Sequence, residues 1–221
     1  MQLCFSPRAV RVALLAVCAM ALLSGCTTLQ APARAVVYDF GPGATAPLPT
    51  NRMAPLPPVV LMEVGAPAAL DGTAVLYRLV YADAQQLRPY AQARWSMPPA
   101  QLLRQRVREQ LGARRQVLAP AELAAGSGLT FVLRLELEEF SQLFDTPGSS
   151  RGLVRVSATL GQTGAAGNVR TLAQQSFVVV HPAPSLDAAG GTKALSLASD
   201  TLITQLSTWL QQAEAAVPSN P

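Results

Sequence analysis

The sequence is poor in the residues that most often carry chemistry. Its 221 residues include three cysteines and one histidine, and only 14% of the residues are charged and 5% aromatic. The apolar fraction of 50% excludes an intrinsically disordered chain. With 18 prolines and 15 glycines, the composition also falls short of a collagen-like or low-complexity protein. The length therefore suits one globular domain, with or without tails.

The longest uninterrupted apolar run lies near the N-terminus. Arg8 and Arg11 accompany 12 apolar or small residues from Val12 to Leu23. A membrane-spanning helix needs about 20 such residues, so the run is typical of a secretion signal instead. Leu23-Ser24-Gly25-Cys26 follows and resembles the bacterial lipobox. The resemblance implies that the Cys26 thiol receives a diacylglyceryl group, that the chain is cut before Cys26, and that the new amine is acylated. The alternative is an ordinary signal peptide cut near a cysteine.

These assignments divide the chain into four parts. We predict a signal peptide over residues 1–25, a lipidated tether over 26–35, a domain over 36–216 with a proline-rich loop at 41–58, and a tail at 217–221. The mature chain would keep 15 basic and 13 acidic residues, a net charge of +2 instead of +4. Its one cysteine would carry lipid, which excludes disulfides, thiolate catalysis and cysteine-ligated metals.

The predicted anchor also bears on location. More than one acyl chain holds a protein stably at a membrane surface. The residue after Cys26 is Thr27, whereas the best-known signal for retention at the inner membrane is aspartate. We therefore expect a lipid-anchored protein at the periplasmic face of the outer membrane, with the inner membrane as the alternative.

Residue patterns in the mature chain predict an α/β fold. β-branched and alternating segments predict strands over 36–40, 59–64, 73–79, 90–95, 129–140, 152–160 and 169–180. Apolar residues at helical spacing predict one helix that opens at 97–99, with Ser96 as its N-cap, and ends at Gly112, and another over about 192–215. We expect a single domain in which these two main helices pack on a mixed or largely antiparallel sheet.

The last predicted helix carries a continuous apolar stripe. Leu195, Leu202, Leu206 and Leu210 share one face, with Ala198 and Trp209 at its flanks. Such a stripe has to be covered. We expect the domain's own sheet to cover it, and the alternative is a neighbouring subunit or a lipid tail.

Catalytic and cofactor motifs are not recognisable. His181, the one histidine, lies beside Pro182 without a recognisable nucleophile partner, and Glu136, Glu138 and Glu139 fit a solvated sheet face better than a hydrolase pair. The glycines between 161 and 167 do not match a phosphate-binding loop. We expect a non-enzyme without cofactor or metal, and the small net charge argues against nucleic acid.

The candidate binding residues lie close together in the sequence. Arg104 and Arg108 belong to a basic helix that follows Tyr90 and Trp95, and large aromatic residues and arginine are enriched at binding hot spots. We predict these four residues as a partner-binding set. The alternative is that Trp95 belongs to the core and the arginines form a solvated helix face.

In its order of features, the mature chain resembles the ABC-type transport auxiliary lipoproteins. These are small lipoproteins encoded with bacterial lipid-transport systems that also carry mammalian-cell-entry (MCE) domain proteins. The resemblance covers about residues 36–212. After the lipobox, it is carried by Tyr38-Asp39-Phe40, the strand Val59–Val64, Leu70-Asp71-Gly72, the strand Val75–Arg78, the segment Tyr90-x4-Trp95, Arg94-Trp95-x-x-Pro98 and the pair Leu102-Leu103.

The resemblance implies a non-catalytic accessory of a lipid-transport complex. Its partners would be an MCE-domain protein and the permease and ATPase, which would be separate chains. A homo-oligomer stays open. The other interpretations are a structural envelope lipoprotein without a transport role and, less well supported, a surface hydrolase.

Overall fold

Three long strands that pair in sequence order form the largest part of the fold. The computed structural model describes residues 34–43, 56–123, 129–164 and 168–217, and Ala35–Pro221 form one unit. The strands are β1 (Val36–Tyr38), β2 (Val59–Leu61), β3 (Ala74–Leu79), β4 (Ala84–Trp95), β5 (Val117–Leu118), β6 (Phe131–Thr146), β7 (Ser149–Thr163) and β8 (Val169–Pro182). The helices are η1 (Ala68–Leu70), α2 (Val80–Asp83), α3 (Pro99–Gly112), α4 (Pro120–Leu123) and α5 (Ala188–Ala215).

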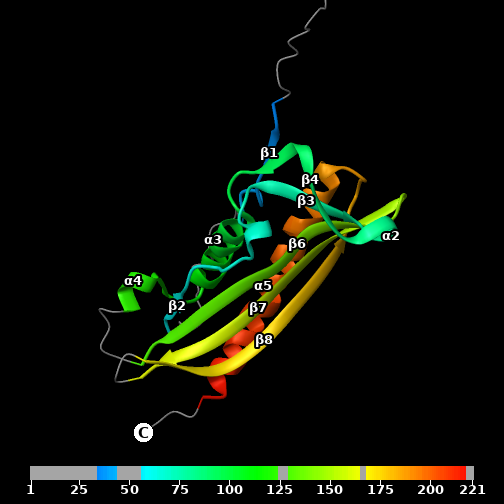
Figure 1. Ribbon diagram of the computed structural model, residues 1–221. Helices are drawn as coiled ribbons and strands as arrows, with labels where there is room; N and C mark the ends of the chain where they lie inside the picture. The colour runs from blue at the N-terminus through cyan, green and yellow to red at the C-terminus, as the bar shows by residue number, and fades with distance from the viewer. Residues whose placement is uncertain (1–33, 44–55, 124–128, 165–167, 218–221) are drawn as a thin grey trace, which may run out of the picture. The chain divides into compact units, whose positions relative to one another are not determined.

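The eight described strands form one mixed sheet around β6 (Figure 1). On one side, β6 pairs antiparallel with β7, which pairs antiparallel with β8. On the other side, β6 pairs in parallel with β2 near its start and with β3 near its end. β5 continues the sheet beyond β2, and β4 and β1 continue it beyond β3. The predicted fold class is thereby confirmed.

The alternation within the first half of β6 explains why one sheet face is covered there and the other is solvated. Leu133, Leu135 and Leu137 are at most 1% exposed, whereas Arg134 and Glu136 between them are exposed. Side chains of a strand alternate between the two faces, so the leucines direct the helices to one side of the sheet.

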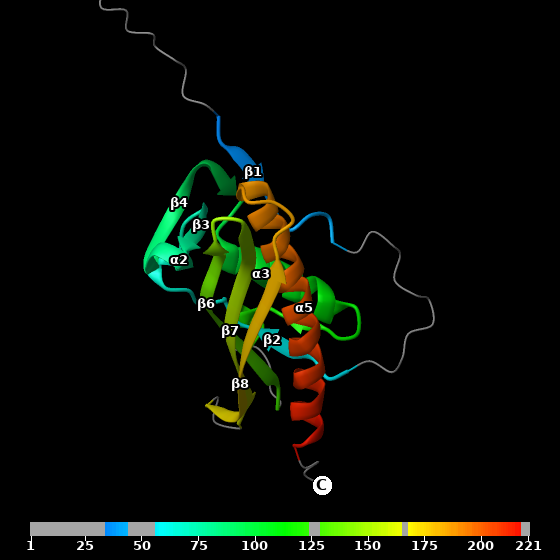
Figure 2. The ribbon, with the colours of Figure 1, turned by 90° about the vertical axis from the view of Figure 1, so that its right-hand side faces the viewer.

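The two main helices bury their apolar stripes within the domain. α5 runs along β7 and β8, and α3 lies next to α5 (Figure 1, Figure 2). Leu195, Leu202, Leu206 and Leu210 are fully buried in one core that includes side chains of the sheet and of α3. The domain's own sheet therefore covers the stripe, as expected. At Gly152 of β7, an added Cβ would lie 2.8 Å from the backbone nitrogen of Leu195, so this close approach of helix and strand requires glycine.

Several element ends differ from the predicted ones. Ser96 is not the N-cap of α3: the helix begins at Pro99, and Pro98 in the cap position offers no side-chain hydrogen bond. α5 begins at Ala188, four residues early, because the Asp187 side chain accepts a hydrogen bond from the Gly190 amide and caps the helix. The short elements η1, α2, β5 and α4 were not predicted.

Candidate functional site

The predicted lipidation site and the predicted contact residues fall in different parts of the chain. Cys26 lies outside the described residues, so its lipidation stays a prediction. Trp95 is 2% exposed, and its ring packs edge-on against Phe40 and Phe140, with centroids 5.8 and 5.5 Å away. This placement favours the alternative stated for Trp95, a core residue.

Tyr90 is half-buried and belongs to a polar network with Gln142 and Ser150. Its hydroxyl donates to Gln142 Oε1 at 2.8 Å, and Gln142 Nε2 donates to Ser150 Oγ at 2.8 Å. The Tyr77 ring lies 4.6 Å from the Tyr90 ring, centre to centre. Burial, together with the charges of Tyr77 and Asp187, raises the pKa of Tyr90 to about 12. The hydrogen bond from this hydroxyl positions the buried Gln142.

The arginines of α3 differ in what they contact. Arg104 forms an ion pair with Glu63, with 2.9 Å between Nη2 and Oε1. Arg108 is exposed and forms no ion pair or hydrogen bond within the described part of the chain. Of the two predicted contact arginines, Arg108 is thus the one whose guanidinium is available to a partner.

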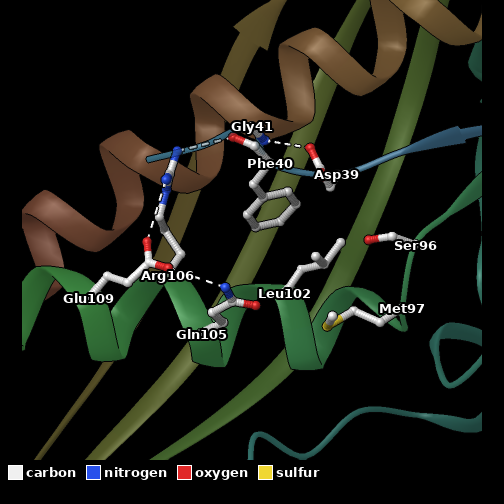
Figure 3. A pocket seen from close by; sticks show the side chains of 9 residues that line it. All are labelled: Asp39, Phe40, Gly41, Ser96, Met97, Leu102, Gln105, Arg106 and Glu109. Atoms are coloured by element: carbon white, nitrogen blue, oxygen red, sulfur yellow. Dashed lines mark hydrogen bonds and ion pairs between the residues drawn. The ribbon is translucent and has the colours of Figure 1, made fainter. Parts of the chain in front are cut away.

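Arg106, which the prediction did not single out, joins three segments of the fold. Its Nε donates to Asp200 Oδ1 of α5 at 2.9 Å. Its Nη2 donates to the Phe40 carbonyl at 3.1 Å, and its Nη1 lies 3.6 Å from Glu109 Oε2 (Figure 3). Gly43 has a φ of +69°, and an added Cβ would lie 2.4 Å from Arg106 Nη1. Glycine at this position therefore lets the chain turn close beside the guanidinium.

A pocket of about 240 Å³ opens beside this arginine. Phe40 points toward Leu102 of α3, and Met97 stands at the start of the helix, so part of the lining is apolar (Figure 3). Arg106 and Glu109 provide charged groups at the same pocket (Figure 3). We call this the Phe40 pocket. Its full lining is Asp39, Phe40, Gly41, Ser96, Met97, Leu102, Gln105, Arg106 and Glu109.

A second hollow of about 430 Å³ adjoins the same segment, toward the first turns of α5. It shares Asp39, Phe40 and Gly41 with the Phe40 pocket, and Lys193 is the cation in its lining. The segment that follows β1 therefore lies between two hollows, one toward α3 and one toward α5. Both combine apolar walls with charged groups, as surfaces that receive a partner's side chains often do.

The described residues offer binding chemistry and no recognisable catalytic arrangement. No group of three or more metal-ligating side chains occurs among them. His181 is partly exposed at the end of β8, with Nδ1 3.2 Å from the Pro182 carbonyl, and Glu139 forms an ion pair with Arg78 at 3.0 Å. No described helix is both long and apolar enough to cross a membrane.

Comparison with known proteins agrees with this fold. The structure resembles the crystal structure of protein XCC0632 from Xanthomonas campestris, described as DUF330, with a TM-score of 0.63, 18% identity, and coverage of 81% of this chain and 97% of that one. A second crystal structure, of an uncharacterised protein, matches with a TM-score of 0.53, 17% identity, and coverage of 80% and 99%. No curated protein matches.

The family model of the ABC-type transport auxiliary lipoprotein component matches residues 38–207. This span begins in β1, contains the segment beside the Phe40 pocket, and ends within α5. The chain belongs to the family of ABC-type transport auxiliary lipoprotein components.

Proposed function

We propose that this protein is a non-catalytic accessory lipoprotein of an MCE-associated ABC system for lipid transport. Lipid on Cys26 would hold it at the periplasmic face of the outer membrane, where its domain would contact the MCE-domain protein and, through it, the permease and ATPase. The observation that carries the proposal is the family match over residues 38–207. The lipobox-like sequence before Cys26 supports the anchor.

The chemistry of the domain supports a binding role. At the Phe40 pocket the arginine is already engaged, because Arg106 bonds to Asp200 and the Phe40 carbonyl, and on the same helix Arg104 pairs with Glu63. Such interactions stabilise a surface without activating a nucleophile. A partner would meet a fixed surface at the Phe40 pocket and the free guanidinium of Arg108 on α3.

The anchor is tested by following processing and location together. Wild-type protein should have the mass of a chain that begins at lipidated Cys26 and should sediment with outer membranes. Cys26→Ala should remain uncut, unacylated and outside the outer-membrane fraction, whereas the matched variant Cys18→Ala, inside the signal run, should behave like wild type. An unmodified N-terminus produced by a cut elsewhere would contradict the anchor, and lipidated protein in the inner membrane would contradict the location.

A further inference from the structure

The outer edge of β8 is a free row of backbone hydrogen-bonding groups. β8 pairs with β7 along one edge, and no described strand pairs with the other. The Ala183 amide donates to the Ser150 carbonyl at 2.9 Å, which fixes the phase of the antiparallel ladder. Because hydrogen-bonded and non-hydrogen-bonded pairs alternate, the N–H and C=O groups that point away from β7 are those of Gln174, Ser176, Val178 and Val180.

This edge lacks the features that usually protect an exposed strand. Natural edges are kept from pairing by lysine, proline, bulges or short length. From 171 to 180 the strand has no charged residue and no proline, and Val178 and Val180 are 55% and 42% exposed. The register irregularity of β8 lies before Ala173, outside the stretch 174–180. The nearest positive charge on β7 is Arg155, opposite Val178.

A groove runs beside the same edge, between β8 and α5. It has a volume of about 340 Å³ and contains no charged side chain. The rings of Phe177 and Trp209 meet edge-on, with centroids 5.9 Å apart, and form its apolar part. Amides and hydroxyls complete the lining, from Gln175, Thr204, Gln205, Thr208 and Gln212.

The edge and the groove together define the occupant. A strand added to β8 would bond to the outward backbone groups, and seven residues would span the stretch 174–180, about 23 Å. Its side chains would alternate, one set entering the uncharged groove at Trp209 and the other lying beside Val178 and Val180. The site therefore favours an uncharged segment with apolar side chains at alternate positions.

A second copy of this chain fits the site poorly. Paired through its own β8, the second copy would present Phe177 and Val179 on the helix side of the sheet. These side chains are 3% and 7% exposed because they already pack on α5 of the same copy. They are not free to enter the groove of a neighbour, so the occupant is a segment that is not packed on a helix of its own.

We propose that the β8 edge and the β8–α5 groove form a strand-addition site for an extended, uncharged segment of a partner protein. The site lies apart from the Phe40 pocket and is built from β8 and α5 alone. Its test therefore does not depend on the transport role: the site can be occupied in a protein that contacts no transporter, and the transport role can hold if the site binds nothing.

The test is hydrogen exchange of the full-length protein in detergent, resolved to single amides, with a synthetic peptide as probe. The probe is acetyl-Thr-Leu-Thr-Val-Thr-Leu-Thr-amide at millimolar concentration. We expect it to slow exchange at Gln174, Ser176, Val178 and Val180 by about tenfold or more, because these amides gain a partner. The amides of Phe177 and Val179 should not change, since β7 already binds them. The same peptide with alternate nitrogens methylated should protect none of these amides.

Three variants distinguish pairing at the β8 edge from non-specific binding of the peptide. Val178→Lys with Val180→Lys places charges along the open edge and should abolish the protection, whereas Val37→Lys, at a 63% exposed position on β1, should leave it intact. Trp209→Ala opens the groove without changing the edge and should weaken the protection. It serves as the test if the lysine variant folds poorly. The proposal is overturned if the peptide protects none of the four amides, if the methylated peptide protects them equally, or if they are already protected in a sample that sediments as a dimer.

Discussion

At the scale of single residues, one buried ion pair joins the ends of the two main helices. Arg115 follows α3 and Glu214 lies in the last turn of α5, and their side chains are 1% and 6% exposed. Arg115 Nη2 donates to Glu214 Oε2 at 2.9 Å, and Arg115 Nη1 donates to Glu214 Oε1. A guanidinium and a carboxylate tolerate such burial only together, because each alone would lose its hydration without compensation.

We expect Glu214→Ala to lower the free energy of unfolding by about 3–5 kcal/mol, because it leaves a buried unpaired guanidinium. Urea unfolding of the mature chain would measure the loss. The matched control is Asp145→Ala, which removes the partner of Arg151 from a pair with 36% and 39% exposed side chains, and should cost about 0–1 kcal/mol. Replacing both buried partners, with Arg115→Met and Glu214→Leu, should restore most of the stability. Equal losses at Glu214 and Asp145 would contradict this account of the buried pair.

Tyr90 should make the fold sensitive to alkaline pH. Its pKa is about 12 in the folded chain, whereas an unfolded tyrosine has a pKa of about 10. The unfolded state therefore loses its proton first, so the stabilisation is complete below pH 10 and is lost as the pH rises toward 12. Tyr90→Phe should unfold with a shallower dependence on pH between 10 and 12, although it loses the bond to Gln142. Identical slopes for the two proteins in urea unfolding across this range would argue against a buried, protonated hydroxyl.

At the scale of elements, the packing of α5 on strands β6, β7 and β8 supplies a large part of the core. Leu206 is fully buried in the middle of its stripe, whereas the neighbouring Gln205 is exposed. Removing a buried leucine side chain costs about 2–5 kcal/mol. Leu206→Ala should accordingly lower the melting temperature without a change in oligomeric state, and Gln205→Ala should melt close to wild type. Normal melting of Leu206→Ala together with a loss of assembly would show that the stripe is an interface and not core.

Elements with a local periodic signal could be predicted from the sequence, and elements held by distant contacts could not. The alternation of β6 and the leucine spacing of α5 are visible within single segments, so both were predicted. The continuation of β6 past Phe140 was missed because the register shifts between Leu137 and Glu139 and because Ser141 is a buried polar residue. Buried polar residues interrupt the alternation on which a strand prediction depends.

In the candidate site, too, contacts between residues far apart in the sequence could not be predicted. Tyr90 and Trp95 were predicted together because they are close in sequence, but sequence proximity does not reveal that the Trp95 ring is enclosed by Phe40 and Phe140. Arg106 was not singled out because its partners, Asp200 and the Phe40 carbonyl, lie 94 and 66 residues away. No local pattern distinguishes Arg106 from its neighbours on the helix.

At the scale of the whole molecule, the family assignment and the chemistry of the described side chains both favour a role in binding a partner. The chain belongs to the auxiliary lipoprotein family, and its Phe40 pocket combines an apolar wall with an arginine that is already ion-paired. Arg108, with its free guanidinium, is the residue of the predicted contact set whose charge can be reversed with the least effect on folding. Arg108→Glu should therefore weaken capture of the transport partner several-fold at unchanged melting temperature, because it replaces attraction by repulsion at the contact. The matched control is Arg134→Glu, an exposed site on the open face of the sheet.

The most direct test of the central claim is recovery of the partner complex from gently solubilised membranes. The tagged, lipidated protein would be purified in mild detergent, and the co-purifying chains identified and quantified by mass spectrometry. We expect an MCE-domain protein together with the permease and ATPase of an ABC system, in amounts that fall with Arg108→Glu and not with Arg134→Glu. Recovery of the intact lipidated chain without any of these components would contradict the proposed role in lipid transport.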